Sequence, residues 1–211
     1  YSHLAWYNLA HAYAYLCLYD KAIEAYEFAF LINEVFEVAY RDYAEICFEL
    51  HRYQEAIPVY EALLEKFELD SEPLLRLGQC YWKTGNIARA RHYLHQTAQL
   101  DTLNEEVFFS LGEIYAGEEN WQKAISFYKK AIDIEYCREE YFLALAKAYW
   151  QLGDLAEAEF YFQEATQTAP ENIQCWYQYG CFLLSLEEKE AALDLLEDAV
   201  ELMDESELEY C

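Results

Sequence analysis

The sequence predicts an all-α protein built from six helical hairpins, each 34 residues long. Three observations support this prediction. Alanine recurs at 34-residue intervals, large apolar side chains repeat at fixed offsets from it, and the 211 residues include only six Gly and three Pro. So few turn-forming residues argue against an all-β architecture. The chain is 55% hydrophobic and 18% aromatic, which is enough for a large core in one or two domains.

The repeat is clearest in the second half of each hairpin. Steps of 34 residues from Ala22 reach Ala56, Ala90, Ala124, Ala158 and Ala192. Because alanine is about one residue in twelve in ordinary proteins, the chance probability of this series is on the order of 10⁻⁶. The residues four positions after these alanines are Tyr26, Tyr60, Leu94, Tyr128, Phe162 and Leu196. Such a spacing traces one face of a helix.

The first half of each hairpin repeats in the same register. Sixteen residues before each alanine stand Trp6, Tyr40, Leu74, Phe108, Phe142 and Trp176. Four positions further on stand Ala10, Ala44, Gly78, Gly112, Ala146 and Gly180. Both positions fall on one helix face. The small residues are expected where a neighbouring helix approaches closely.

Glycine and proline indicate how the predicted helices end and begin. Gly85 and Gly153 lie between paired helices, where a left-handed residue ends the first helix. In other hairpins this position holds Cys17, Glu119 and Glu187. Looser turns are expected in those hairpins. Pro58 lies near the start of a second helix and removes one backbone donor, which predicts a late start or a slight bend.

The pattern resembles that of the tetratricopeptide repeat (TPR) family, especially of bacterial TPR arrays. That family carries a large apolar residue, Leu-Gly and Tyr on a first helix, then Ala, an aromatic residue and Ala on a second. The resemblance implies a right-handed α-α superhelix, a TPR solenoid, whose first helices line the concave face. It implies one domain over residues 3–206, with 207–211 opening a truncated seventh repeat. The repeats are 3–36, 37–70, 71–104, 105–138, 139–172 and 173–206.

Both ends of the predicted solenoid look uncapped. Finished solenoids need terminal repeats with polar outer faces. Trp6 stands near the start with no helix before it, and there is no initiator Met. The last complete helix, residues 191–203, has apolar residues on more than one side: Leu193, Leu195, Leu196, Val200 and Leu202. We therefore expect a fragment of a longer protein, with self-association through the uncapped ends.

The charge and the cysteines restrict the partners and the location. The formal net charge is −26 and the pI about 4.3, so nucleic acid and anionic membrane surfaces are poor partners. No apolar run reaches the length of a bilayer span. Seven cysteines form no CxxC pair and no regular framework, which favours free thiols and a cytoplasmic location.

Chemical motifs are missing from the sequence. No phosphate-binding glycine loop, HExxH or GxSxG occurs, so neither an enzyme nor a cofactor is expected. His92 and His95 stand three residues apart, but no nearby Cys or His completes a metal site. The favoured function is a non-enzymatic scaffold that binds a peptide or helical segment of a partner protein. The alternatives are a regulatory or substrate-delivery segment of a larger enzyme and a chaperone for secreted proteins.

In the TPR family, first-helix positions between the core ones form the concave groove. Carried over, they give candidate partner-binding residues Tyr7, His11, Arg41, Glu45, Phe48, Leu75, Gln79, Trp82, Phe109, Glu113, Lys147, Trp150 and Tyr177. Aromatic and acidic residues together favour a partner segment with apolar anchors and spaced Lys or Arg. Trp82 and Trp150 occupy the same repeat position and are the strongest anchor candidates. Alternatively, these aromatics pack between adjacent first helices. The residues that hold a chaperone's terminal carboxylate in some TPR proteins are not assembled in any register.

Overall fold

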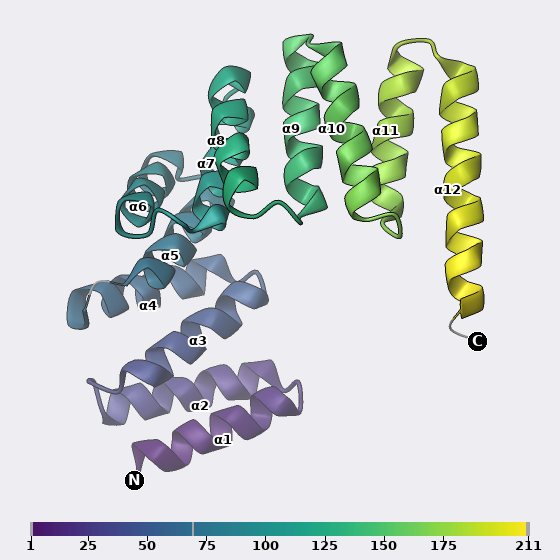
Figure 1. The fold of residues 1–211 in the computed structure, drawn as a ribbon. Helices are drawn as coiled ribbons and strands as arrows, with labels where there is room; N and C mark the ends of the chain where they lie inside the picture. Colours follow the sequence, from purple (N-terminus) through teal and green to yellow (C-terminus); the bar gives the residue numbers. More distant parts are fainter. Residues whose placement is uncertain (1, 69, 210–211) are drawn as a thin grey trace. The chain divides into compact units, whose positions relative to one another are not determined.

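The computed structural model describes the backbone of residues 2–68 and 70–209, and the side chains of these residues up to 200. Within this part of the chain, twelve α-helices form the regular structure, one pair to each expected 34-residue range (Figure 1). The last helix continues past residue 206 to Glu209, into the segment where a seventh repeat was expected to open. The helices are α1 (His3–Tyr15), α2 (Tyr19–Ile32), α3 (Glu37–Glu49), α4 (Tyr53–Lys66), α5 (Ser71–Lys83), α6 (Ile87–Leu100), α7 (Glu105–Gly117), α8 (Trp121–Ile134), α9 (Glu139–Leu152), α10 (Leu155–Thr168), α11 (Ile173–Ser185) and α12 (Lys189–Glu209).

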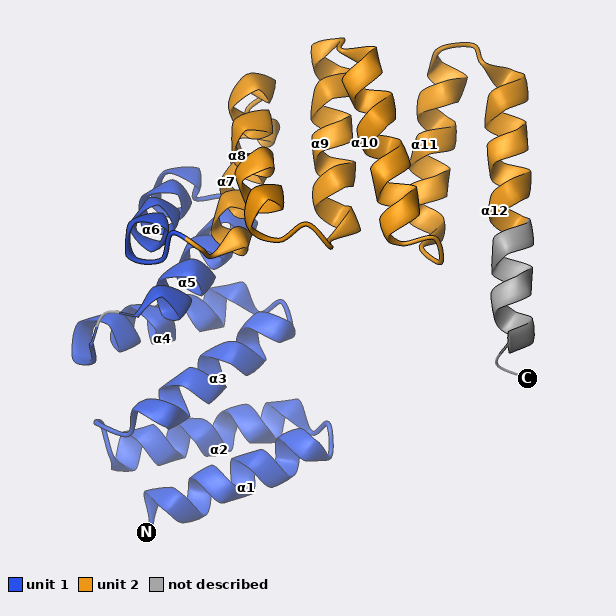
Figure 2. Ribbon diagram, viewed as in Figure 1, with its two compact units in different colours: residues 1–102 blue, residues 103–211 orange. Residues whose placement is uncertain are grey.

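The chain divides into two compact units, residues 1–102 and 103–211, shown in Figure 2. Unit 1 holds α1 to α6 and unit 2 holds α7 to α12. Within each unit, the second helix of a hairpin packs against the first helix of the next hairpin. The first helices also contact one another, α3 with α5 in unit 1 and α9 with α7 and α11 in unit 2. One face of each unit is therefore formed by first helices.

The repeating alanines of the sequence lie in the core of the structure. All of them are buried, from Ala22 at 0% exposed to Ala192 at 1%. The large residues that follow four positions later are buried in the first five hairpins: Tyr26, Tyr60, Leu94, Tyr128 and Phe162. The 34-residue period is thus a period of core packing, which confirms the helical pattern predicted from the sequence.

Side chains that cap helix N-termini add local stability. In six helices the residue before the first turn accepts a hydrogen bond from a backbone N–H two or three residues on. These caps are Asp70, Asn86, Asn104, Asn120, Asp154 and Asn172. Each such cap is worth about 1 kcal/mol. α1 to α4 begin without a side-chain cap, so these helices depend more on tertiary packing.

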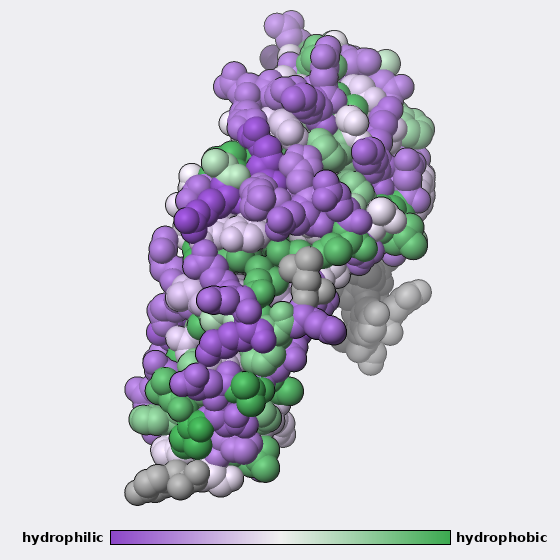
Figure 3. Space-filling model, turned by 90° about the vertical axis from the view of Figure 1, so that its left-hand side faces the viewer, coloured by the Kyte–Doolittle hydropathy of each residue, from purple (hydrophilic) through white to green (hydrophobic). Residues whose placement is uncertain are grey.

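The outer helices leave apolar side chains exposed. Leu9 on α1 is 38% exposed, whereas Leu77 and Leu111 at the same repeat position are 0% exposed. Green, hydrophobic surface also shows at the lower end of Figure 3, where α1 and α2 lie. On α12, Leu193 and Val200 are 57% and 58% exposed. Leu202, which the sequence analysis placed with them, lies outside the described side chains.

The expectation of looser turns at Cys17, Glu119 and Glu187 is wrong. These residues have φ of 56°, 56° and 64°, in the same left-handed region as Gly85 and Gly153. The hydrogen bonds are also the same, since Glu119 N donates to Ala116 O at 2.9 Å and Gly85 N to Trp82 O at 2.9 Å. His51, with φ of 59°, completes the series. The packed hairpin imposes one turn geometry on whichever residue stands there.

The late start expected at Pro58 is also wrong. α4 begins at Tyr53, five residues before the proline, and continues to Lys66. Ala56 and Tyr60, on either side of Pro58, are buried at the same repeat positions as in the other hairpins. Packing of this helix face therefore outweighs the loss of one backbone hydrogen bond.

Replacing Glu119 by Gly should stabilise the protein by roughly 0.5–1 kcal/mol. A side chain in the left-handed region costs about 1–2 kcal/mol, and the greater freedom of glycine in the unfolded chain cancels part of that gain. The measurement is the free energy of unfolding in urea. Gly85→Ala is the converse control, because no atom lies within 4 Å of an added Cβ and only the φ of +84° opposes it. Stabilisation by both substitutions would contradict this account.

Replacing Gly112 by Ala should destabilise unit 2 by about 1–3 kcal/mol, the usual cost of overpacking. An added Cβ would lie 2.5 Å from Cδ1 of Tyr128, a ring that is 1% exposed and has little room to shift. Gly180→Ala is the matched control, because its Cβ would lie 3.4 Å from Leu196, an ordinary contact distance. Thermal melts of both variants distinguish them. Equal melting temperatures would show that Tyr128 adjusts freely.

Candidate functional site

The candidate residues lie on the faces formed by first helices. In unit 1, α1 carries Tyr7 and His11, α3 carries Arg41, Glu45 and Phe48, and α5 carries Leu75, Gln79 and Trp82. In unit 2, α7 carries Phe109 and Glu113, α9 carries Lys147 and Trp150, and α11 carries Tyr177. The two units hold separate halves of the predicted set, so each half is described on its own.

Asp42 joins the first two candidate residues of unit 1. The hydroxyl of Tyr7 donates to Oδ2 of Asp42 at 2.8 Å, and Nε2 of His11 lies 3.1 Å from the same oxygen. Burial, with the contribution of Asp42, raises the pKa of Tyr7 to about 12. The Asp42 carboxylate thus holds two side chains from α1 against α3.

The charged residues of α3 are engaged in internal pairs. Nη2 of Arg41 lies 2.7 Å from Oε1 of Glu37 and 3.0 Å from Oδ2 of Asp70. Glu45 accepts a hydrogen bond from the hydroxyl of Tyr60 at 3.1 Å. Arg41 and Glu45 also line a small pocket of about 180 Å³. Much of their charge therefore serves unit 1 itself rather than a partner.

Cations cover two aromatic candidates of unit 1, Phe48 and Trp82. The guanidinium of Arg76 lies over the ring of Phe48 at 4.9 Å, and its Nη1 donates to Oε1 of Gln79 at 3.1 Å. The ammonium of Lys83 lies 4.0 Å from the ring centre of Trp82. Such cation–π contacts are worth about 0.5–1 kcal/mol when exposed. Phe48 and Trp82 are half-buried under these charges.

Leu75 and Tyr177 lie at opposite extremes of exposure. Leu75 is 1% exposed, so the structure corrects its assignment: it belongs to the core and offers no surface to a partner. It follows Leu74, the core position of the repeat, which is also 1% exposed. Tyr177 is 60% exposed on α11 and remains accessible.

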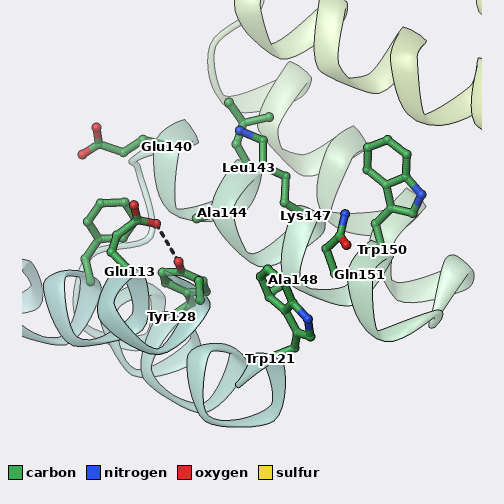
Figure 4. A pocket seen from close by; sticks show the side chains of 12 residues that line it. Glu113, Trp121, Tyr128, Glu140, Leu143, Ala144, Lys147, Ala148, Trp150 and Gln151 are labelled. Carbon is green, nitrogen blue, oxygen red and sulfur yellow. Dashed lines mark hydrogen bonds between the residues drawn. The ribbon is translucent and has the colours of Figure 1, made fainter. Parts of the chain in front are cut away.

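Unit 2 contains a pocket of about 520 Å³ that combines four candidate residues, Phe109, Glu113, Lys147 and Trp150. α9 forms most of it, and α7 and α8 supply the rest. The other lining residues are Ala116, Trp121, Tyr128, Glu140, Leu143, Ala144, Ala148 and Gln151. Figure 4 shows Glu113 and Tyr128 facing α9 across this space. Pockets of this size commonly hold small molecules or a few side chains.

A partly buried hydrogen bond forms part of one wall of the pocket. The hydroxyl of Tyr128 donates to Oε1 of Glu113 at 2.6 Å, drawn as the dashed line in Figure 4. Burial, with the nearby charge of Glu113, raises the pKa of Tyr128 above its usual value. The ring of Phe109 lies 5.6 Å from Tyr128 and 4.7 Å from Tyr141. The wall is therefore rigid and mostly aromatic, with one carboxylate.

Trp150 serves both the pocket and the core. Its ring lies 5.6 Å from Phe182 and 6.4 Å from Phe162 in edge-on contacts, while it also lines the pocket. Truncating Trp150 would thus affect stability as well as any binding. Trp121 was missed by the sequence reasoning because it opens a second helix, whereas the groove pattern uses first helices only. Its large ring at a position held by Tyr53 in unit 1 was the available signal.

The histidine pair noted in the sequence, His92 and His95, lies on α6. His92 and His95 line a hollow on α6, where burial and Arg91 lower the pKa of His95. In the part of the chain that the structure describes, no group of three or more His, Cys, Asp or Glu side chains could hold a metal ion. None of the described helices combines the length and the apolar character needed to cross a membrane.

Comparisons with known families give the same family at every matched part of the chain. Five family models, all described as tetratricopeptide repeat, match residues 7–71, 48–111, 107–139, 138–180 and 173–202. No curated protein matches the chain.

Solved structures share the fold at low identity. A crystal structure of MamA protein has a TM-score of 0.73 and 19% identity, over 82% of this chain and 94% of that one. MamA 41-end from Desulfovibrio magneticus RS-1 has a TM-score of 0.70 and 17% identity, over 81% and 96%. The APC/C hetero-tetramer Cut9–Hcn1 has a TM-score of 0.74 and 17% identity, over 95% of this chain and 40% of that one. These likenesses confirm the all-α repeat fold.

Raising the pH through 10 should destabilise unit 2 through Tyr128. Its folded pKa lies above the unfolded value of 10.0, so its contribution is fully present below pH 10 and is lost as the pH rises further. Urea unfolding between pH 8 and pH 12 measures the effect. Tyr128→Phe should make the decline shallower by up to about 1.4 kcal/mol per pH unit. Identical pH profiles for the two proteins would show that Tyr128 ionises as easily folded as unfolded.

Proposed function

Because the chain belongs to the tetratricopeptide repeat family, we propose that it is a non-enzymatic scaffold that binds a peptide or helical segment of a partner protein. The observation that carries this proposal is the 520 Å³ pocket, where four residues chosen from the sequence come together. The pocket has aromatic walls and a few polar groups, the usual composition of a recognition site.

The chemistry of the pocket favours a segment with apolar anchors and at least one basic residue. Phe109, Trp121 and Leu143 offer apolar surface, and Glu113 and Glu140 offer negative charge. Aromatic residues in half-buried positions are frequent anchors of protein interfaces. The overall charge of −26 would speed the approach of basic partners and repel acidic ones, with an effect that salt weakens.

Self-association is a second candidate, favoured by the open face of α1. Leu9 is exposed there although the same repeat position is buried in the third to sixth hairpins, and Leu16, seven residues further on, is 62% exposed. Another copy or another protein could cover this face. The hetero-tetramer Cut9–Hcn1 supports the general idea that such repeats build assemblies. A regulatory segment of a larger enzyme and a secretion chaperone remain alternatives, and the cysteine pattern supports a cytoplasmic location.

Filling the pocket should abolish peptide binding. Peptides selected from a random display library against the natural sequence should lose roughly tenfold or more in affinity for the Ala144→Phe variant. Ala156→Phe is the matched control, because Ala156 is exposed on α10 and does not line the pocket. Titration calorimetry gives the dissociation constants, and melting temperatures verify folding. A failure to select any peptide, or equal loss in both variants, would reject the pocket as the binding site.

A further inference from the structure

Residues 68 apart in sequence stand at the same position two repeats apart, so the neighbours α3 and α5 of unit 1 can be compared directly with α7 and α9 of unit 2. In unit 1, Arg76 occupies the space between α3 and α5. Its Nε lies 2.9 Å from Oε1 of Glu72 and 3.7 Å from Oε1 of Glu45, and its guanidinium lies over Phe48 at 4.9 Å. Gln79 accepts a hydrogen bond from Nη1 of Arg76. An arginine of the chain itself is thus the natural occupant of this space.

Unit 2 keeps the carboxylates, the tyrosine and the leucine around Arg76, but not the arginine or its contacts Phe48 and Gln79. The carboxylates Glu45 and Glu72 correspond to Glu113 and Glu140, and Ala144 stands where Arg76 does. The remaining counterparts are Tyr60 with Tyr128, Phe48 with Ala116, Gln79 with Lys147, and Leu75 with Leu143. All the unit 2 members of these pairs line the 520 Å³ pocket. The pocket is therefore the space that an arginine side chain fills two repeats earlier.

The carboxylate chemistry of this space is also preserved. In both units a tyrosine hydroxyl fixes the carboxylate: Tyr60 donates to Glu45 at 3.1 Å, and Tyr128 donates to Glu113 at 2.6 Å. Glu45 has the guanidinium of Arg76 as its cation. Among the described residues, no Lys or Arg nitrogen lies within ion-pair distance of Glu113. A half-buried carboxylate in an aromatic pocket is stabilised by a cation that enters it.

We propose that the unit 2 pocket binds an arginine side chain of a partner segment, with its guanidinium on Glu113 and its methylene stem against Leu143 and Phe109. This inference rests on the proposed function and names the group that the pocket recognises. Arginine suits the site better than lysine, because its planar guanidinium pairs with carboxylates and stacks on aromatic faces at the same time. The counterparts of Arg76 and Phe48 are Ala144 and Ala116. These small side chains leave room for a guanidinium group.

Lys147 is the one lining residue that opposes a cation. It is exposed and stands where Gln79 contacts Arg76 in unit 1. Glu140, which also lines the pocket, is partly satisfied by Arg138, whose Nη1 lies 3.2 Å from its Oε1. Neutralising Lys147 should therefore tighten arginine binding, which gives a test in the direction of gained affinity.

The first experiment uses N-acetyl-arginine amide as the probe and the unaltered chain. With 15N-labelled tryptophan, NMR should show saturable shifts of the indole N–H signals of Trp121 and Trp150, both of which line the pocket. The indole of Trp82, at the matching position of unit 1, should not shift, because Arg76 occupies that space. N-acetyl-citrulline amide, which has nearly the same shape without the charge, should bind about tenfold or more weakly. Equal binding of the citrulline and arginine probes would overturn the proposal.

The second experiment changes the pocket. Ala144→Arg should rebuild the unit 1 arrangement inside unit 2, abolish the indole shifts and raise the melting temperature, whereas Ala144→Leu should block the probe without that gain. Glu113→Gln should weaken the probe about tenfold, and Lys147→Gln should strengthen it. Probe binding that survives Ala144→Arg would overturn the proposal. If display-selected peptides need the pocket but tolerate citrulline in place of arginine, this inference fails while the proposed function stands.

Discussion

The close contact between the two helices of each hairpin determines both the core and the surface chemistry. In the fourth hairpin, Gly112 lets the ring of Tyr128 lie directly across the first helix, so near that a Cβ there would be 2.5 Å away. That position of the ring brings its hydroxyl to Glu113, on the exposed side of α7. In the second hairpin, Ala44 and Tyr60 produce the same result at Glu45. The packing that holds the hairpin together therefore also orients the carboxylates of the first-helix face.

Such internal pairing changes how the acidity of the chain should be understood. A formal charge of −26 suggests a uniformly acidic surface. In the structure, Asp42 holds Tyr7 and His11, Glu45 holds Tyr60 near Arg76, and several other acids are paired within their unit. The negative charge available to a partner would be that of carboxylates with no cation nearby. On the faces formed by first helices, Glu113 is the clearest example. Under the proposed function, specificity would depend on which of these pairs are incomplete as well as on the total charge.

The sequence predicted the helices well because the period of 34 residues is the period of packing. Every repeated alanine proved to be buried, and each expected range holds one helical pair. The residue preferences of turns and helix starts were less reliable predictors where tertiary packing opposed them. Glu119 adopts the left-handed turn of a glycine, and Pro58 lies inside α4, because the packed faces on either side fix the backbone. Leu75 was assigned to the surface by its repeat position, but its side chain is buried in the packed structure.

The pocket could not be predicted in the same way, because it forms where small side chains leave a space. Phe109, Glu113, Lys147 and Trp150 were each identifiable as candidates, yet their convergence depends on Ala116 and Ala144, two residues with no chemistry of their own. The first-helix position of Ala144 differs in every repeat: Asn8, Asp42, Arg76, Ser110, Ala144 and Gln178. The positions around it keep their carboxylate and tyrosine in two of the hairpin junctions. A solenoid can therefore keep its core while two small residues, at the positions of Phe48 and Arg76, leave open a space between two first helices that is filled from within two repeats earlier.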